Sequence, residues 1–324
     1  MSSTSAMPNP SESFEPYRRR LLGLAYRMLG SMADAEDAVQ ETYLRWHGAD
    51  RDRVSTAKAF LMITTTRICI DMLTSARARR EEYVGPWLPE PILDTAALTP
   101  DSRMELAEDL SIALLLTLDR LSPLERAAFL LHDVFDFSFS EVASALERNE
   151  AACRKLAARA RANVRASRPR GATIPRASSG GIDPEHAQFL SAFAAATQSG
   201  DLNAITQLLA SDVRVVTDGG GKVRAALKVI DGADRVAQFL VGVTRKKRED
   251  AWWRDDFTLR FALVNGLPGV VVDSSQGPVQ TTTFEIEGEV IKALYVVRNP
   301  DKLRHLAPAR QNRGSERTTL VDSN

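Results

Sequence analysis

The sequence predicts a multidomain protein in which two all-α units are followed by one α+β unit with an antiparallel sheet. Three observations lead to this fold class. Apolar residues recur at helical spacing over 14–80 and again over about 100–167. Two stretches rich in proline and glycine, 85–91 and 168–184, interrupt the helical pattern. Beyond about residue 210, apolar and polar residues alternate with the period of two that half-buried strands have.

These breaks divide the 324 residues into two or three domains, as the length also predicts at about 150 residues per domain. We expect a disordered N-terminus at 1–13, a first helical domain at 14–82, a linker at 83–108, a second helical domain at 109–168, a second linker at 169–183, an α+β domain at 184–305 and a disordered tail at 306–324. The first linker contains Trp-Leu-Pro-Glu-Pro at 87–91, whose prolines forbid a regular helix and favour extended chain.

The composition is that of an ordinary globular protein, with 44% apolar residues, 26% charged residues, and 42 each of Lys+Arg and Asp+Glu. No apolar run approaches the roughly 18 residues that cross a bilayer, and the first 13 residues lack the features of a secretory signal. We therefore expect a cytoplasmic protein that does not bind membranes. Cys69 and Cys153 lie in apolar periodic segments and should be buried thiols. Two cysteines and four histidines predict neither a metal site nor a cofactor.

Charge is distributed unevenly along the chain, although the total is zero. Residues 101–150 hold 11 acids and 4 bases, whereas 151–176 hold 8 bases and no acid. Because exposed structural helices usually mix both signs, the basic run favours contact with nucleic acid about as much as a solvated helix face. Charge alone leaves both interpretations open.

Three helices are expected in the first helical domain. Residues 21–29 carry one apolar stripe and residues 38–46 another, with Gly30 and Ser31 between them. A third helix, at about 56–80, should direct inward the side chains of Phe60, Ile63, Ile70 and Leu73.

The second helical domain has the pattern of a helix-turn-helix. Ser122 suits the N-cap of one helix, and Ser138 with Glu141 has capping-box spacing for a short second helix. The turn that follows lacks glycine, so either Arg148 or Asn149 must adopt the turn conformation, and Asn149 can cap the last helix.

The last helix would bury a stripe that includes Cys153 and present a basic outer face. Its outward residues are Arg154, Lys155, Arg159, Arg161 and Arg165. A basic second helix after a tight turn is the arrangement that enters the DNA major groove. We expect Arg154 and Lys155 nearest to bases, and the other three arginines nearest to phosphates. The alternative is a helical hairpin with a solvated basic face.

The α+β domain should begin with one or two helices, at about 184–198 and 201–210. Strand-like runs follow at Val213–Thr217, Val223–Ile230, Phe257–Val264, Gly269–Asp273, Thr281–Glu287 and Val290–Val297. Between the first two runs, Asp-Gly-Gly-Gly-Lys at 218–222 fits a hairpin turn, because glycine adopts positive φ without strain.

No catalytic constellation is evident in the α+β domain. Asp218, Asp231 and Asp273 are the candidate carboxylates, but none has a histidine or a second carboxylate in a recognisable pattern nearby. His186 and His305 flank the domain. We therefore predict no catalytic residue and no enzymatic turnover.

Five motifs, in order along the chain, resemble a known family. Residues 34–46 follow Tyr-Arg-Met-Leu-Gly at 26–30 and resemble region 2 of bacterial sigma factors of the extracytoplasmic-function (ECF) group, and 112–166 resembles their region 4. Three further motifs resemble the subgroup with a fused SnoaL-like domain: Trp-Leu-Pro-Glu-Pro at 87–91, Asp-Gly-Gly-Gly-Lys at 218–222 and Asn-Pro-Asp-Lys-Leu at 299–303.

The resemblance implies an alternative sigma factor that binds core RNA polymerase, at the clamp helices of the largest subunit and at the flap, and directs transcription initiation. Asp37, Gln40 and Glu41 match the positions that engage the clamp helices. Their i, i+3, i+4 spacing places them on one helix face, able to meet a basic coiled coil. Without the resemblance, these three residues would be interpreted as an ordinary acidic helix face exposed to solvent.

Promoter contacts are implied at two places. Arg67 and Asp71 match the helix that captures bases melted at the minus-ten element, with an intrahelical pair between them as the alternative. The residues implied at the nearby phosphates are Arg77, Arg79 and Arg80. Those implied at the minus-thirty-five duplex are Asn149, Arg154, Lys155, Arg159 and Arg161.

The resemblance further implies a SnoaL-like, NTF2-like C-terminal fold, which is a curved sheet closed by helices into a cone with room for an unidentified small-molecule ligand. A fused domain can regulate the sigma domains in cis at high effective concentration, without a separate anti-sigma factor. The implied interdomain contacts are Trp87, Leu88, Pro89, Glu90, Pro91, Asp218, Gly219, Gly220, Gly221, Lys222, Asn299, Pro300, Asp301, Lys302 and Leu303.

Two other functions stay open. One is a helix-turn-helix regulator that does not act through core polymerase. The other is a DNA-binding protein whose C-terminal domain senses a ligand or catalyses a cyclase-like or isomerase-like reaction. Binding to core polymerase would argue against a regulator that acts without polymerase. Enzymatic turnover of a substrate would support a catalytic C-terminal domain.

Overall fold

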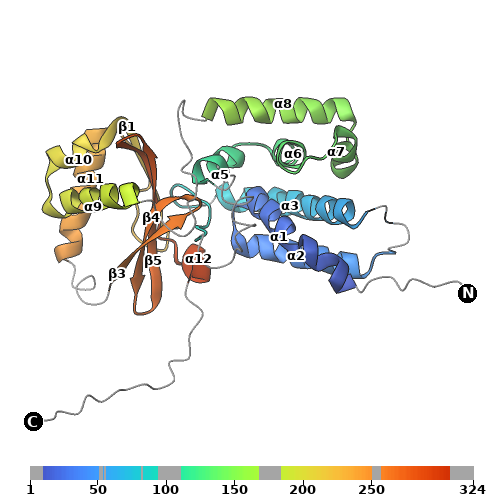
Figure 1. Cartoon of the computed structure of the whole chain (residues 1–324), viewed down its shortest axis with the longest axis horizontal. Coiled ribbons are helices and arrows are strands. Elements are labelled where there is room, and N and C mark those ends of the chain that lie inside the picture. Colours follow the sequence, from blue (N-terminus) through green and yellow to red (C-terminus); the bar gives the residue numbers. More distant parts are fainter. Residues whose placement is uncertain are drawn as a thin grey trace, which may run out of the picture.

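The structure is a computed structural model, and it describes residues 10–50, 54, 56–81, 83–93, 111–167, 184–249 and 257–306. Figure 1 shows a sheet unit on the left and two helical units on the right, with the second helical unit stacked on the first. The predicted termini at 1–13 and 306–324, apart from 10–13 and Leu306, lie outside the described residues. None of the helices in the described ranges is both long and apolar enough to cross a membrane.

The first helical unit consists of α1 (Pro10–Leu29), α2 (Met32–His47) and α3 (Ala57–Glu81). Gly30 adopts a φ of 69° and so ends α1, after which the Ser31 side chain accepts a hydrogen bond from the Asp34 amide and caps α2. Buried residues such as Leu24 and Ala38 form the core between these helices. The three predicted helices are confirmed.

The second helical unit consists of α5 (Ile112–Asp119), α6 (Pro123–Phe129), the π-helical turn η2 (Leu130–Val134), α7 (Phe139–Leu146) and α8 (Glu150–Ser167). Ser122 caps α6 and a capping box starts α7 at Ser138, both as predicted, and Glu125 completes a capping box at Ser122 as well. In the turn before α8, however, Glu147 takes the left-handed conformation with φ of 52°, and neither Arg148 nor Asn149 does. Asn149 instead caps α8, since its Oδ1 accepts a hydrogen bond from the Ala152 amide at 2.8 Å.

The sheet unit has a six-stranded sheet in the order β2-β1-β6-β5-β4-β3. Its strands are β1 (Leu209–Asp218), β2 (Ile230–Asp231), β3 (Thr258–Val264), β4 (Leu267–Ser274), β5 (Gly277–Glu287) and β6 (Val290–Val297). Neighbouring strands are antiparallel except β1 and β6, which run parallel. The sheet is not closed on itself, and it is mixed where a purely antiparallel sheet was predicted, because β1 and β6 are parallel neighbours.

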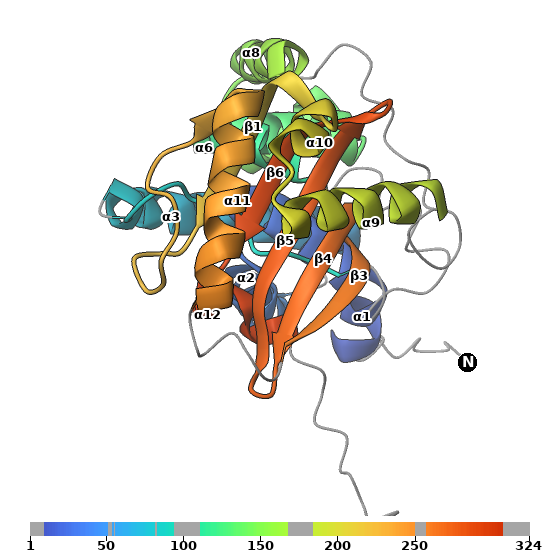
Figure 2. The same cartoon turned by 90° about the vertical axis from the view of Figure 1, so that its left-hand side faces the viewer.

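Helices cover one face of this sheet, namely α9 (Pro184–Ser199), α10 (Leu202–Gln207) and α11 (Ala233–Glu249). Figure 2 shows α9 and α11 in front of the sheet and the helical units behind it. Phe193, Val236 and Phe284 belong to the core on this face. The short helices α12 (Pro300–Leu303) and η4 (Arg304–Leu306) follow the last strand.

Two predictions for the sheet unit are wrong. Val223–Ile230 is not a strand, because only Ile230 and Asp231 pair with β1. The preceding residues form a loop that the Thr217 hydroxyl fastens by donating to the Ala226 carbonyl oxygen at 3.0 Å. The glycine-rich motif is therefore no hairpin turn. The helix α11 was not predicted from the sequence.

A third core joins the units. Leu88 of the linker and Ile112 of α5 pack against Tyr295 and Leu303 of the sheet unit. The core of the first helical unit also continues into the second, through residues such as Leu131. Consequently the face of the sheet opposite α9 and α11 is covered by the linker and α5, together with the short helices α12 and η4. Cys69 and Cys153 are buried free thiols, and burial raises the pKa of both.

Candidate functional site: an interdomain clamp on the linker

Residues 83–93 form an extended linker segment between the first helical unit and the sheet unit. Leu88, Pro89, Glu90 and Pro91 are buried, although they lie in neither a helix nor a strand. A buried extended chain needs partners for its backbone polar groups. Those partners come from two clusters, one around Asp218 and one around Glu90.

Asp218 is the centre of the first cluster. It ends β1, is fully buried, and its carboxylate accepts four hydrogen bonds. Oδ1 accepts from the Tyr83 hydroxyl at 2.5 Å and from the Gly220 amide at 3.0 Å. Oδ2 accepts from the Leu88 amide at 2.8 Å and from Lys302 Nζ at 2.7 Å. The carboxylate thus ties the linker to α12, and the same environment of burial and negative charge raises the pKa of Tyr83.

Lys302 supplies the positive charge of this cluster. Its side chain is 8% exposed and its ammonium also donates to the Leu88 carbonyl oxygen at 2.5 Å. The ammonium lies 4.2 Å from the centre of the Trp87 ring and 5.0 Å from that of Tyr83. Cation–π contacts and hydrogen bonds of this kind compensate the loss of water around a buried charge.

Asn299 connects α12 to the same cluster. Its Oδ1 caps α12 by accepting from the Asp301 amide at 3.1 Å, while its Nδ2 donates to the Tyr83 hydroxyl at 3.0 Å. Asp301 forms an ion pair with Lys222 at the surface, which lowers the pKa of Asp301. The three motifs predicted to meet between domains therefore do meet.

The glycines of the 218–222 motif leave room for these contacts. Gly220 has a φ of 58°, and a Cβ on it would lie 2.2 Å from Asn299 Nδ2. A Cβ on Gly219 would lie 2.4 Å from the Val223 carbonyl oxygen. A larger residue is thus excluded at Gly219 by close approach, and at Gly220 by both close approach and backbone conformation.

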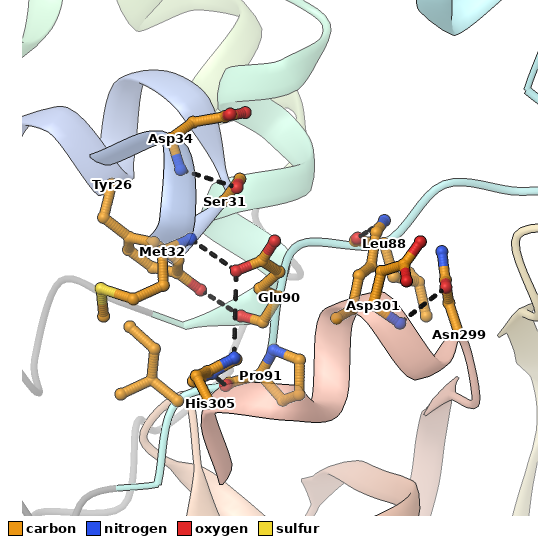
Figure 3. A network of polar contacts seen from close by, with 12 residues as sticks. Tyr26, Ser31, Met32, Asp34, Leu88, Glu90, Pro91, Asn299, Asp301 and His305 are labelled. Carbon is orange, nitrogen blue, oxygen red and sulfur yellow. Dashed lines mark hydrogen bonds and ion pairs between the residues drawn. The ribbon is translucent and has the colours of Figure 1, made fainter. Parts of the chain in front are cut away.

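Glu90 is the centre of the second cluster, shown in Figure 3. Its Oε2 accepts a hydrogen bond from the Met32 amide at 2.7 Å, at the first turn of α2. Its backbone amide donates to the Gly30 carbonyl oxygen at 2.9 Å. His305 of η4 donates from Nε2 to the Pro91 carbonyl oxygen at 2.7 Å, and its Nδ1 lies 4.0 Å from Glu90 Oε2. A carboxylate at a helix N-terminus is favoured by the free amides there.

Asn265 brings the sheet unit into the same cluster. It lies in the turn between β3 and β4, with a φ of 51° and 1% exposure. Its Nδ2 donates to the Tyr26 hydroxyl at 2.8 Å, and that hydroxyl donates to the Glu90 carbonyl oxygen at 2.6 Å. The Asn265 amide donates to the Ile92 carbonyl oxygen at 2.8 Å.

Four residues of these clusters were not predicted from the sequence to make interdomain contacts: Tyr26, Tyr83, Asn265 and His305. The Asn-Gly pair at 265–266 is a hairpin signal and marks the turn correctly. The Asn-Gly pair does not indicate which residues the turn contacts in the folded protein. We refer to the two clusters together as the linker clamp.

The residues predicted to bind polymerase lie on the outer face of α2. Asp37 and Gln40 are exposed, and Glu41 pairs with Arg45 at 2.9 Å. The helical spacing places the three side chains on one face, as expected.

Arg67 is placed differently from the prediction. Its guanidinium donates from Nε to the Ala145 carbonyl oxygen at 2.9 Å and from Nη2 to the Ser144 carbonyl oxygen at 2.8 Å. The same Nη2 lies 3.3 Å from Glu147 Oε1, so its ion-pair partner lies on the second helical unit and is not Asp71. Asp71 is exposed on α3. The side chains of Arg77, Arg79 and Arg80 lie outside the described residues.

The predicted recognition helix α8 buries its apolar stripe and exposes its bases. Cys153, Ala157 and Ala160 are buried, while Lys155 and Arg165 are exposed. Three arginines of α8 form ion pairs. Arg154 pairs with Glu150 of the same helix at 2.6 Å, while Arg159 pairs with Glu125 of α6 at 3.2 Å and Arg161 with Asp133 of η2 at 2.6 Å. The acids at 101–150 therefore hold part of the basic face in place.

The three carboxylates considered for catalysis are engaged in ion pairs. Asp231 pairs with Arg214 at 2.9 Å and Asp273 with Arg260 at 3.0 Å. Asp218 belongs to the linker clamp. None of these pairs brings a second carboxylate or a histidine to the aspartate as a proton-transfer partner.

Comparisons with known proteins agree with this architecture. The family models for Sigma-70 region 2 and Sigma-70, region 4 match residues 14–79 and 111–164. The chain is 38% identical to the ECF RNA polymerase sigma factor SigJ of Mycobacterium tuberculosis, with 89% of this chain and 91% of that one covered. It is 28% identical to the probable ECF sigma factor SigI of the same species, with 90% and 94% covered. The crystal structure of M. tuberculosis SigJ covers 90% of this chain and 97% of its own, at 33% identity and a TM-score of 0.68.

Proposed function

The chain belongs to the ECF RNA polymerase sigma factors, and from this premise we propose that its sheet unit regulates the two sigma domains in cis through the linker clamp. The first helical unit is sigma region 2 and the second is sigma region 4. A protein with these domains acts as an alternative sigma factor, which binds core RNA polymerase and promoter DNA to initiate transcription.

For the contacts with polymerase and DNA, we propose the residues that the family resemblance implies. Asp37, Gln40 and Glu41 would meet the clamp helices of the largest subunit. Region 2 would contact the minus-ten element through Arg67, Asp71, Arg77, Arg79 and Arg80. Region 4 would contact the minus-thirty-five duplex through Asn149, Arg154, Lys155, Arg159 and Arg161, since most of these side chains are exposed on α8.

The buried ion pair between Asp218 and Lys302 is the observation that carries the regulatory proposal. Asp218 and Lys302 bind the backbone amide and carbonyl groups of Leu88, in the segment that leads from the first sigma domain toward the second, so the sheet unit is attached directly to this linker. The sheet unit is part of the same chain, and its effective concentration at the linker is therefore high. This arrangement replaces a separate anti-sigma factor.

Glu90 extends the influence of the clamp to the helix that would bind polymerase. Its carboxylate accepts from the Met32 amide, one turn before Asp37 on the same helix. Release of the linker would therefore also remove a cap from α2. A small molecule bound by the sheet unit would regulate transcription if its affinity differed between the clamped and the released state.

Run-off transcription with core polymerase tests the proposal. The template is the DNA upstream of the protein's own coding region or, where that gives no transcript, promoters selected from genomic fragments. We compare the full chain, truncations after residues 180 and 305, and Lys302→Met. The proposal predicts that the truncation after residue 180 and Lys302→Met alter promoter output several-fold, whereas the truncation after residue 305 keeps the contacts of Asp218 and Lys302 and is the control. Unchanged output from the truncation after residue 180 would overturn the proposal.

A helix-turn-helix regulator that acts without polymerase makes a different prediction. We expect Asp37→Arg to abolish co-purification with core polymerase while leaving binding to duplex DNA intact. Retained co-purification would remove the polymerase contact that we assign to this residue.

A further inference from the structure

At the interface of the two sigma domains, one arginine of each domain binds backbone carbonyl groups of the other. Arg126 of α6 is 4% exposed, and its Nη1 donates to the Met28 carbonyl oxygen in the last turn of α1. Its Nη2 lies 3.3 Å from Asp119 Oδ1, which fixes the guanidinium within its own domain. The last carbonyl groups of a helix have no partner within the helix, so an arginine from outside can cap them.

Arg67 makes the reciprocal contact. It projects from α3 of region 2 and donates to the Ser144 and Ala145 carbonyl oxygens, in the last turn of α7 of region 4. Glu147, next to these carbonyl groups, adds an ion pair at 3.3 Å. Each domain thus caps a helix C-terminus of the other with one arginine.

Further contacts surround the two arginines. Arg20 and Arg27 of α1 lie 5.5 and 5.7 Å from the ring centre of Phe135, and Lys58 of α3 lies 5.6 Å from that of Phe137. The three cations belong to region 2 and both rings to region 4. The interface is therefore specific and is not only an apolar contact.

The packed arrangement cannot serve both promoter elements at once. The minus-ten and minus-thirty-five elements are centred about 25 base pairs apart, which is about 85 Å of B-form DNA at ~3.4 Å per base pair. In the structure, region 2 and region 4 share a continuous core. Moreover, the guanidinium of Arg67 is bound to backbone carbonyl groups of α7 and would have to leave them to contact DNA.

We propose that Arg67 and Arg126 form a reciprocal latch, which holds the sigma domains together and keeps Arg67 from DNA until the domains separate. The DNA part of this inference rests on the proposed role of Arg67 at the minus-ten element. Arg126 has no assigned contact with DNA or polymerase, so a change there loosens the latch without changing the proposed DNA site.

A distance measurement in the full chain tests the latch. Spin labels are placed at Glu36→Cys on α2 and Ala166→Cys on α8, both exposed, while the native Cys69 and Cys153 are 0% exposed and stay unlabelled. We expect pulsed electron paramagnetic resonance to give one short distance for the parent. Arg126→Met should add a population at longer distance, whereas Arg120→Met, an exposed arginine of the same domain, should not.

DNA binding gives the second readout. With a random-sequence single-stranded 12-mer, Arg126→Met should bind about threefold to tenfold more tightly, because a larger fraction of molecules is open. Adding Arg67→Gln should remove that gain. A distance change without a gain in binding would keep the latch but remove the DNA role of Arg67, which belongs to the proposed function.

An unchanged distance distribution in a folded Arg126→Met protein would overturn the latch. Should this variant fail to fold, as judged by circular dichroism, Glu147→Gln decides in its place. Glu147 is 74% exposed, so its loss does not threaten the fold. It should give a smaller open population, and no shift in its distances would equally overturn the proposal.

Discussion

Asp218 shows how one buried side chain organises the contact between domains. Its four donors come from the linker, from α12 and from its own loop. A buried carboxylate is tolerated only with such a full set of partners. Lys302 and Tyr83 lie 84 and 135 positions away along the chain, so no local pattern identifies them. The motif at 218–222 could be located from the sequence, but its partners could not be derived from spacing.

Gly220→Ala tests the close approach at this site. The new Cβ would lie 2.2 Å from Asn299 Nδ2 in a left-handed backbone, so we expect a loss of about 2–3 kcal/mol in the free energy of unfolding. Gly288→Ala is the matched control, because its φ is 61° and nothing lies within 4 Å of its Cβ position. The control should lose only about 1 kcal/mol. Urea unfolding measures both, and equal losses would contradict the packing argument.

At the scale of elements, local chemistry was predictable and partner-dependent conformation was not. The N-cap at Ser122 and the capping box at Ser138 depend on residues within three positions of each other, and both form as predicted. The run Val223–Ile230 has strand propensity, but the loop contacts of Ala226 prevail over it. The positive φ falls on Glu147, whose exposed side chain then reaches Arg67 of the other domain.

Ser138→Ala tests the cap of α7. We expect a loss of about 1 kcal/mol, since the Glu141 amide then lacks its acceptor. Hydrogen bonds from Ser138 lower the pKa of Glu141 below its ordinary value of 4.5. A carboxyl group whose pKa is lowered in the folded state stabilises the protein at pH values above its ordinary pKa. This stabilisation is lost as the pH falls through the lowered pKa of the folded state.

The difference between parent and Ser138→Ala should therefore shrink on acidification below about pH 4.5. Ser140→Ala, at an exposed position inside α7, should change stability by less than about 0.5 kcal/mol. Urea unfolding at pH 7 and at several acidic pH values measures all three proteins. A difference that grows toward acid would contradict the cap.

At the scale of the whole molecule, hydrophobic cores extend across the boundaries between the three units, so each unit packs against at least one other. Leu88 and Ile112 join the linker and α5 to the sheet unit, and Leu131 belongs to the core that also includes α1. Helix and strand patterns predicted each unit separately. They could not predict that the linker and α5 cover the sheet face opposite α9 and α11, because this contact depends on residues from three distant segments.

Calorimetry tests this sharing of cores. We expect a single unfolding transition for the full chain and two for Asp218→Ala, in which Lys302 is left as a buried charge without its carboxylate. Breaking such a pair costs about 3–5 kcal/mol. Asp212→Ala removes an aspartate that is 73% exposed and paired with Lys292, and should leave one transition. Two transitions in the parent would show that the units unfold independently.

The linker clamp also determines where this protein can be cut and recombined. The sheet unit contacts residues 83–93, which precede region 4 in the sequence, whereas the sheet unit itself follows region 4. The linker clamp is therefore built from two separate parts of the chain, this segment and the C-terminal unit. A chimaera that exchanges only the C-terminal unit between relatives places Asp218 and Asn265 against a linker segment from another protein. Exchange of both parts together preserves the linker clamp.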